Sequence, residues 1–149
     1  MPASAVLLCL VVAITDGDTL KARCGEPGSY QQITVRISAI DAPEKRQPFG
    51  EASRQNLAGL CFKTWARISP KDTDRYGRTV GDVECRGQDV AAEQVQAGMA
   101  WYYVKYGRGY EALAGLEAGA RAMGRGLWAL PGAVEPWSWR KRPKTSTSL

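Results

Sequence analysis

The chain of 149 residues is long enough for one domain with a hydrophobic core, but too short for two such domains. Hydrophobic residues make up 44% and charged residues 23% of the sequence, as in ordinary globular proteins. There is no histidine, which excludes Ser-His-Asp triads, Cys-His dyads and histidine-based zinc sites. The formal net charge of +5 modestly favours a polyanionic partner, although many basic surfaces bind nothing in particular.

Residues 5–14, AVLLCLVVAI, form an apolar run that is too short to cross a bilayer as a helix. The run lacks the basic residues that begin a secretory signal, and no small-residue cleavage site separates it from Asp16. Two interpretations of residues 1–9 stay open, a truncated signal peptide or the start of the first strand. We expect a monomer without a stable membrane span, and a secreted or periplasmic location is slightly favoured over a cytoplasmic one.

The four cysteines show no CxxC spacing, so a zinc site is not expected. Cys24, Cys61 and Cys85 could supply one disulfide in an oxidising compartment, or remain buried thiols in the cytosol. The sequence alone does not choose a pairing.

The pattern along the chain predicts short strands first and helices later. Residues 10–23 read as two strands around a tight DGDT turn, and residues 32–40 alternate so that Arg36 faces away from the core side chains. Pro43 ends that strand. Further elements are expected in chain order: a helix at 51–61, a strand at 64–68, a polar loop at 69–78, a strand at 79–85, a helix after Asp89 and a helix at 110–123.

These elements predict a mainly β fold with packed helices, specifically a five-stranded OB-type barrel with two to three helices. We divide the chain into an apolar N-terminus at 1–9, the barrel domain at 10–130 and a basic, mostly disordered C-terminal tail at 131–149. The tail ends in WSWRKRPKTSTSL, which favours a solubilising segment over a specific phosphate-binding one.

Three charged clusters carry the chemistry. They are DGDT at 16–19, Arg36 leading into DAPE at 41–44, and DRYGR at 74–78. Each alone has a bland interpretation as a hairpin turn, a surface ion pair or a solvated loop. Together, and with GMAWYY and EAGARAMGRGLW further on, they resemble the staphylococcal nuclease (thermonuclease-like) family over residues 11–128.

The resemblance implies a calcium-dependent nuclease that hydrolyses phosphodiester bonds of DNA and RNA. In that family Asp18 and Asp41 would be carboxylate ligands to calcium, the backbone carbonyl of Ala42 a third ligand, and Asp16 an outer-shell group. Oxygen ligands of this kind suit a hard divalent cation. The family's best-known member has threonine in place of Ala42, which leaves a main-chain ligand unchanged.

The same resemblance makes Glu44 the general base that activates or orients water, while Arg36 and Arg78 hold the phosphate. Arginine suits this role because its planar fork matches phosphate oxygens and stays charged. Tyr76 and Tyr103 are substrate-binding candidates, and the aromatic run at 101–103 fits base stacking or core packing. The alternative function is a non-catalytic OB-type nucleic-acid-binding module, but carboxylates without a metal would repel phosphate.

Overall fold

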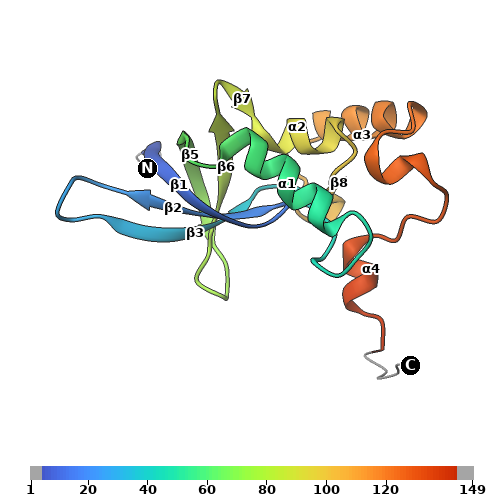
Figure 1. The fold of residues 1–149 in the computed structure, drawn as a ribbon, viewed down its shortest axis with the longest axis horizontal. Helices are drawn as coiled ribbons and strands as arrows, with labels where there is room; N and C mark the ends of the chain where they lie inside the picture. The colour runs from blue at the N-terminus through green and yellow to red at the C-terminus, as the bar shows by residue number, and fades with distance from the viewer. Residues whose placement is uncertain (1–4, 144–149) are drawn as a thin grey trace.

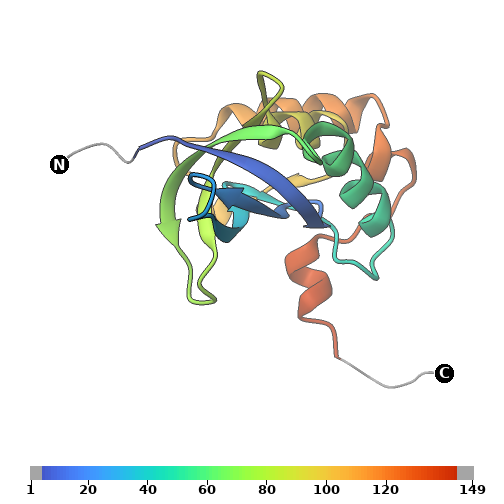
Figure 2. The ribbon, with the colours of Figure 1, turned by 60° about the vertical axis from the view of Figure 1, so that its left-hand side comes forward.

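A closed barrel is the centre of the structure, a computed structural model that describes residues 5–143. The barrel strands are β1 (Leu7–Asp16), β2 (Thr19–Cys24), β3 (Gln31–Ile37), β5 (Trp65–Thr73) and β6 (Thr79–Cys85). They pair in the order β3-β2-β1-β5-β6, and β6 closes the circle by pairing in parallel with β3. The curvature of β1 and β5 over the other strands is plain in Figure 2. This confirms the predicted five-stranded OB-type barrel.

Three helices gather at one end of the barrel, while the β2–β3 hairpin extends from the other (Figure 1). These are α1 (Gly50–Cys61), α2 (Val90–Gln96) and α3 (Ala112–Ala122). The remaining elements are β4 (Ile40–Asp41), β7 (Gln88–Asp89), β8 (Trp101–Tyr102), α4 (Pro136–Arg140) and 3-10 turns at Val104–Tyr106 and Gly126–Ala129. No helix within residues 5–143 is both long and apolar enough to cross a membrane.

The core lies inside the barrel and under the helices because the β-branched faces of the strands point inward. Fully buried side chains include Val11, Leu20, Val35, Ile68, Val83, Val90 and Val95. In α3 the buried side chains are Leu113 and Ala120, whereas Met123 lies beyond the helix and is 68% exposed. Leu127, in the turn that follows, is buried.

Two strands differ from the sequence-based expectation. The strand expected at 32–40 ends at Ile37, because Ala39 adopts a positive φ of 68° and turns the chain into β4. The loop expected from residue 69 is a strand as far as Thr73, because this stretch pairs with β6 up to the Thr73–Thr79 pair. Regular pairing therefore extends farther toward the charged turn at 74–78 than composition indicated.

All four cysteines form disulfides. Cys9 in β1 pairs with Cys24 in β2, and Cys61 at the end of α1 pairs with Cys85 in β6. The sequence-based estimate of one disulfide was too low, because Cys9 lies in β1 and faces the core with its partner across the hairpin.

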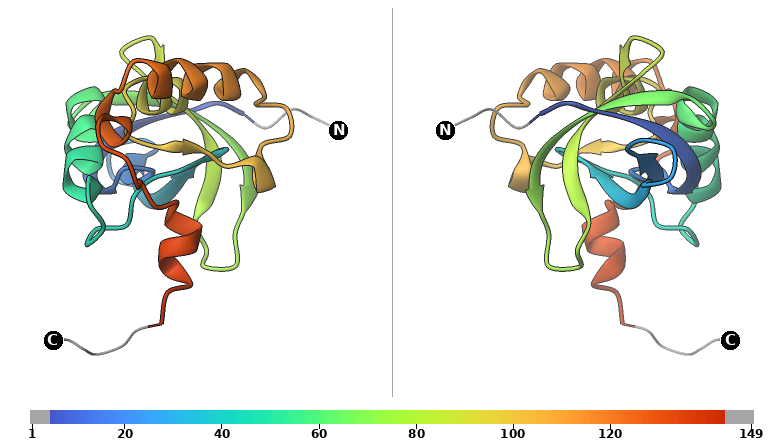
Figure 3. Two further views of the ribbon diagram at one scale, coloured as in Figure 1. Left: turned by 90° about the vertical axis from the view of Figure 1, so that its right-hand side faces the viewer. Right: turned by 90° about the vertical axis from the view of Figure 1, so that its left-hand side faces the viewer.

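The ends of the predicted barrel domain also shift. β1 begins at Leu7, so residues 7–9 belong to the first strand. The expectation of a mostly disordered tail does not hold at residues 136–140, which form α4 with a proline in its first turn. Residues 1–4 and 144–149 lie outside the described part of the chain. Figure 3 shows α4 below the barrel, on the side away from α3.

Candidate active site

The tight turn between β1 and β2 brings two carboxylates to the rim of the barrel. Asp16 accepts a hydrogen bond from the Asp18 amide at 3.1 Å, which closes the turn. Asp18 is buried, and its carboxylate accepts a hydrogen bond from the Thr19 hydroxyl at 2.8 Å. The DGDT turn therefore holds the Asp18 carboxylate through the hydroxyl of its own threonine.

The DAPE segment meets this turn from the other side. The Ala42 amide donates a hydrogen bond of 2.7 Å to Asp18 across 24 residues of sequence. Asp41 lies in β4, where it pairs with Trp101 of β8, and its side chain is only 1% exposed. The short β4–β8 ladder thus holds Asp41 beside Asp18.

Arg36 lies between the two carboxylates. Its Nη2 is 3.6 Å from Asp18 Oδ2 and 3.5 Å from Asp41 Oδ1. The register between β2 and β3 places Arg36 opposite Thr19, directly after the acidic turn. Its Nη1 donates a hydrogen bond of 2.9 Å to the Ile37 carbonyl, which orients the guanidinium. The three charged clusters predicted from sequence are therefore partly assembled here, on one face of the barrel.

Burial and mutual repulsion shape the charge state of these carboxyl groups. Burial, reinforced by the neighbouring Asp18, raises the pKa of Asp16 to about 8. Burial also raises the pKa of Asp18, but Arg36 and the hydrogen bonds outweigh burial and leave the pKa below its usual range. Burial raises the pKa of Asp41 despite the opposing hydrogen bond from Arg140. Burial therefore favours the protonated form of Asp16, while Arg36 favours the ionised form of Asp18.

Glu44 follows the cluster in a loop that is held by hydrogen bonds between the Glu44 backbone and Gln47. Its amide donates a hydrogen bond of 2.9 Å to the Gln47 side chain, and its carbonyl accepts from the Gln47 amide at 2.8 Å. The side chain is 39% exposed and forms an ion pair of 2.8 Å with Arg140 of α4. Glu44 thus stands at the open edge of the site, accessible to water.

Arg78 and Tyr76 lie on the hairpin between β5 and β6. Arg78 is held by Asp74, with Nε 2.7 Å from Asp74 Oδ2, and Tyr76 is 69% exposed. Arg78 directly precedes Thr79, which pairs with Val35, the neighbour of Arg36. The hairpin therefore approaches the strand of Arg36, while in the described residues the Arg78 side chain bonds to Asp74 and not to the acidic cluster.

The aromatic run has two different roles. Trp101 is 2% exposed and makes an edge contact with Trp128, so it belongs to the core. Tyr103 is half-buried, and its ring stacks on Trp137 of α4 with centroids 5.0 Å apart. Core packing is therefore the structural role of Trp101, while the candidate Tyr103 is covered by an aromatic ring of the chain itself.

Sequence reasoning did not find the buried polar residues that support the acidic turn. The Gln94 side chain of α2 is fully buried and donates a hydrogen bond of 2.7 Å to the Gly17 carbonyl. It also contacts Ser53 of α1, whose hydroxyl donates to the Met99 carbonyl at 2.6 Å. A glutamine on the apolar face of a predicted helix was the available signal, since buried polar groups need partners.

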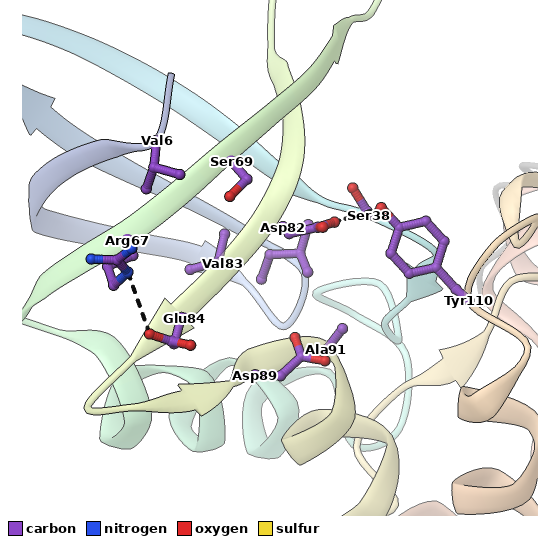
Figure 4. A pocket seen from close by; sticks show the side chains of 11 residues that line it. Val6, Ser38, Arg67, Ser69, Asp82, Val83, Glu84, Asp89, Ala91 and Tyr110 are labelled. Atoms are coloured by element: carbon purple, nitrogen blue, oxygen red, sulfur yellow. Dashed lines mark hydrogen bonds and ion pairs between the residues drawn. The ribbon is translucent and has the colours of Figure 1, made fainter. Parts of the chain in front are cut away.

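A separate pocket of about 300 Å³ lies beside β5 and β6 (Figure 4). The side chains of Asp82, Glu84 and Asp89 line it, and Tyr110 donates a hydrogen bond of 2.5 Å to Asp82. Arg67 pairs with Glu84 at 3.6 Å. Its acidic walls would repel phosphate, and its lining does not include the carboxylates gathered around Arg36.

The barrel with carboxylates and an arginine at its rim defines an OB-type nuclease class. The staphylococcal nuclease homologue family matches residues 34–130, well over half of the chain. Protein ParB of Escherichia coli is 45% identical over 94% of this chain and 82% of its own length. Micrococcal nuclease of Shigella flexneri is 41% identical over 93% of this chain and 83% of its own length. An uncharacterized endonuclease of Haemophilus influenzae is 42% identical over 95% of this chain and 77% of its own length.

The chain belongs to the staphylococcal nuclease family and is a nuclease of the hydrolase class. The family predicted from the three charged motifs is thereby confirmed.

Proposed function

We propose that this nuclease hydrolyses phosphodiester bonds of DNA and RNA with the help of calcium. The observation that carries the proposal is the convergence of Asp18 and Asp41 on Arg36, at 3.6 and 3.5 Å. Two buried carboxylates next to a phosphate would repel it, so the arrangement is productive for nucleic acid only with a cation between them. The names of the relatives, micrococcal nuclease among them, agree with such a substrate.

The donor set fits calcium chemically. Asp18 and Asp41 would supply carboxylate oxygens, Ala42 its backbone carbonyl and Asp16 an outer-shell group. All of these are oxygen donors, which calcium prefers. Within residues 5–143 no three carboxylate or thiol groups form a ready-made cluster, so water and substrate oxygens would complete the set. When bound, the ion would neutralise a phosphate oxygen and so lower the barrier to attack on phosphorus.

The remaining chemistry belongs to side chains of the chain. Glu44, which is open to water, takes a proton from the attacking water molecule or orients it. Arg36 donates hydrogen bonds to the oxygens on which charge develops. Arg78 leaves its ion pair with Asp74 when substrate binds and donates hydrogen bonds to the phosphate from the hairpin. Tyr76, exposed at the tip of that hairpin, and Tyr103 are further substrate contacts in this proposal.

Low base selectivity is expected, because arginine contacts to phosphate carry no sequence information. The alternative is an OB-type module that binds nucleic acid without cleaving it. In that case the same residues would contribute only to the affinity for nucleic acid. No cleavage would be seen with or without the Glu44 side chain.

The proposal is tested by incubating the purified chain with single- and double-stranded DNA and with RNA, in calcium and in a chelator. Cleavage should require calcium and fall by about 10²–10⁴-fold in Glu44→Gln, the range typical for loss of a general base. Arg36→Ala should lose about 10²–10³-fold. Glu26→Gln, an exposed carboxylate in the β2–β3 turn, is the matched control and should cleave normally.

Binding without cleavage in every divalent metal tried would favour the alternative module. Full activity in Glu44→Gln, with Glu26→Gln equally active, would remove Glu44 from the mechanism.

A further inference from the structure

A second arginine reaches the acidic cluster from the far end of the chain. Arg140 Nη2 lies 2.7 Å from Asp41 Oδ2, and its Nη1 lies 3.2 Å from Asp41 Oδ1. The same Nη1 donates a hydrogen bond of 2.8 Å to Glu44. One guanidinium therefore donates hydrogen bonds to both oxygens of Asp41 and to one oxygen of Glu44. This two-pronged geometry is the strongest kind of arginine–carboxylate pair.

The segment that delivers Arg140 is docked by further contacts. Trp137 stacks on Tyr103 at 5.0 Å and 19°, and meets Trp101 edge-on at 6.3 Å. The Gln47 side chain donates a hydrogen bond to the Val134 carbonyl, which ties the approach to α4 to the Glu44 loop. The position of the guanidinium is thus set by packing along residues 134–140 and not by one flexible side chain.

We propose that Arg140 is an internal counter-cation that occupies the carboxylates of the active site, and that α4 is a strap which metal binding must displace. The inference rests on the proposed function for the identity of Asp41 as a ligand and Glu44 as a base. It adds a residue, and a closed state of the enzyme, that the three sequence motifs do not contain.

Competition follows from the number of oxygen atoms available. Asp41 is 1% exposed, and both of its oxygens accept hydrogen bonds from Arg140. Together with the contact of Arg36 at 3.5 Å, the two arginines use three of the roughly four lone-pair sites of this carboxylate. A metal ion that binds these oxygens would also face the positive charge of Arg140 beside them. Arginine does not lose its proton at working pH, so the guanidinium has to move away to relieve the conflict.

Movement of Arg140 is compatible with an intact fold. Its side chain is 42% exposed, and α4 has five residues at the edge of the molecule. The ring of barrel strands closes through the β3–β6 pair without any part of α4. The segment that carries Arg140 can therefore undock while the barrel, Asp18 and Arg36 stay in place.

The proposal predicts that removing Arg140 tightens metal binding. Calcium affinity is measured by isothermal titration calorimetry at one pH and ionic strength, on the full chain and on Arg140→Ala. The dissociation constant should fall by about tenfold or more, which corresponds to the loss of one competing charge-assisted pair. Trp137→Ala, which keeps the guanidinium but loses the aromatic anchor, should shift the constant in the same direction by less.

Arg142→Ala is the matched control, because it removes one positive charge from the same segment. Arg142 lies over the Trp139 ring at 4.2 Å and makes no contact with Asp41 or Glu44 in the described residues. Its calcium constant should stay within about twofold of the parent, since exposed charges are screened. If calcium binding tightened as much in Arg142→Ala as in Arg140→Ala, the effect would come from the net charge of the segment, and the proposal would be overturned.

A second readout follows the strap directly. Hydrogen exchange of the backbone amides at residues 137–142 should become faster when calcium is added to the parent protein. In Arg140→Ala these amides should exchange fast before calcium is added and change little afterwards. Exchange that calcium leaves unchanged in the parent would show that α4 stays docked, and would overturn the strap.

The outcomes separate this inference from the proposed function. If cleavage depends on calcium but the parent and Arg140→Ala have equal dissociation constants for calcium, the strap is overturned and the proposed function stands. Calcium bound by neither protein overturns the metal assignment of Asp41, and the strap with it.

Discussion

A carboxyl group that is taken out of water beside a second carboxyl group holds its proton more tightly, and Asp16 is in this position. Burial and the neighbouring Asp18 raise the pKa of Asp16 from 3.8 to about 8. Between these two pH values the folded chain keeps a proton on Asp16 that the unfolded chain has lost. The folded state therefore binds more protons, and its free energy of unfolding falls as pH rises through this range.

This prediction concerns the metal-free protein. Urea unfolding is measured in a chelator between pH 5 and pH 8 on the parent and on Asp16→Asn. The stability of the parent relative to the variant should decrease steadily with rising pH, because the asparagine carries no titrating group. A difference that stays constant, or that increases with pH, would contradict the raised pKa of Asp16.

At the scale of elements, the acidic turn is positioned by two helices. Gly17 lies against α1, where an added Cβ would be 1.8 Å from Ser53 Oγ and 2.8 Å from Ala42 Cβ. Gln94 of α2 donates hydrogen bonds both to the Gly17 carbonyl and to Ser53. The glycine of DGDT is therefore required for close packing, in addition to any conformational freedom in the turn.

Gly17→Ala should accordingly destabilise the protein by about 1–3 kcal/mol, as overpacking does, and displace Asp18. Denaturant unfolding and cleavage rate measure the two effects. Gly115→Ala is the control, since a Cβ on Gly115 in α3 meets nothing within 4 Å. That variant should gain up to about 1 kcal/mol from helix propensity. Equal stability and equal cleavage rate of the two variants would argue against the contact between the turn and α1.

At the scale of the whole molecule, two disulfides join elements that the barrel brings together. Cys9–Cys24 closes a loop of 15 residues within the β1–β2 hairpin, and Cys61–Cys85 joins α1 to β6 across 24 residues. Both pairs are buried or half-buried in the core cluster. Disulfides of this kind restrict the unfolded chain and persist in oxidising compartments.

Reduction should therefore lower the stability by about 2–4 kcal/mol for each bond. Thermal unfolding with and without a thiol reductant measures the loss, with thiol titration to confirm that the bonds have opened. The variant with serine at all four cysteine positions is the control, and the reductant should not change its melting temperature. A parent protein that melts at the same temperature when fully reduced would contradict a stabilising role.

Patterns in the amino-acid sequence were enough to predict the barrel, which the structure confirms, and to propose the residues of the candidate site. Alternating β-branched residues predicted the strands, and turn chemistry predicted the DGDT hairpin, because both signals lie within a few residues of each other. The same short range covers Arg36, near the end of β3, and Asp41 in β4, which lie on either side of one turn. The order of the motifs then identified the family, and the roles assigned to all the site residues, Glu44 and Arg78 included, remain predictions that depend on it.

Only the tertiary structure decided which distant residues meet. The disulfide pairing, the support of Gly17 by Gln94 and the contact of Arg140 with Asp41 join residues up to 99 positions apart. No local periodicity encodes such contacts, since they depend on how the barrel closes and where the helices then pack. The segment from residue 137 onward looked solvated because a basic run, RKRPK at 140–144, follows its tryptophans. Closure of the barrel nevertheless places the buried Asp41 and the more exposed Glu44 where Arg140 can reach them.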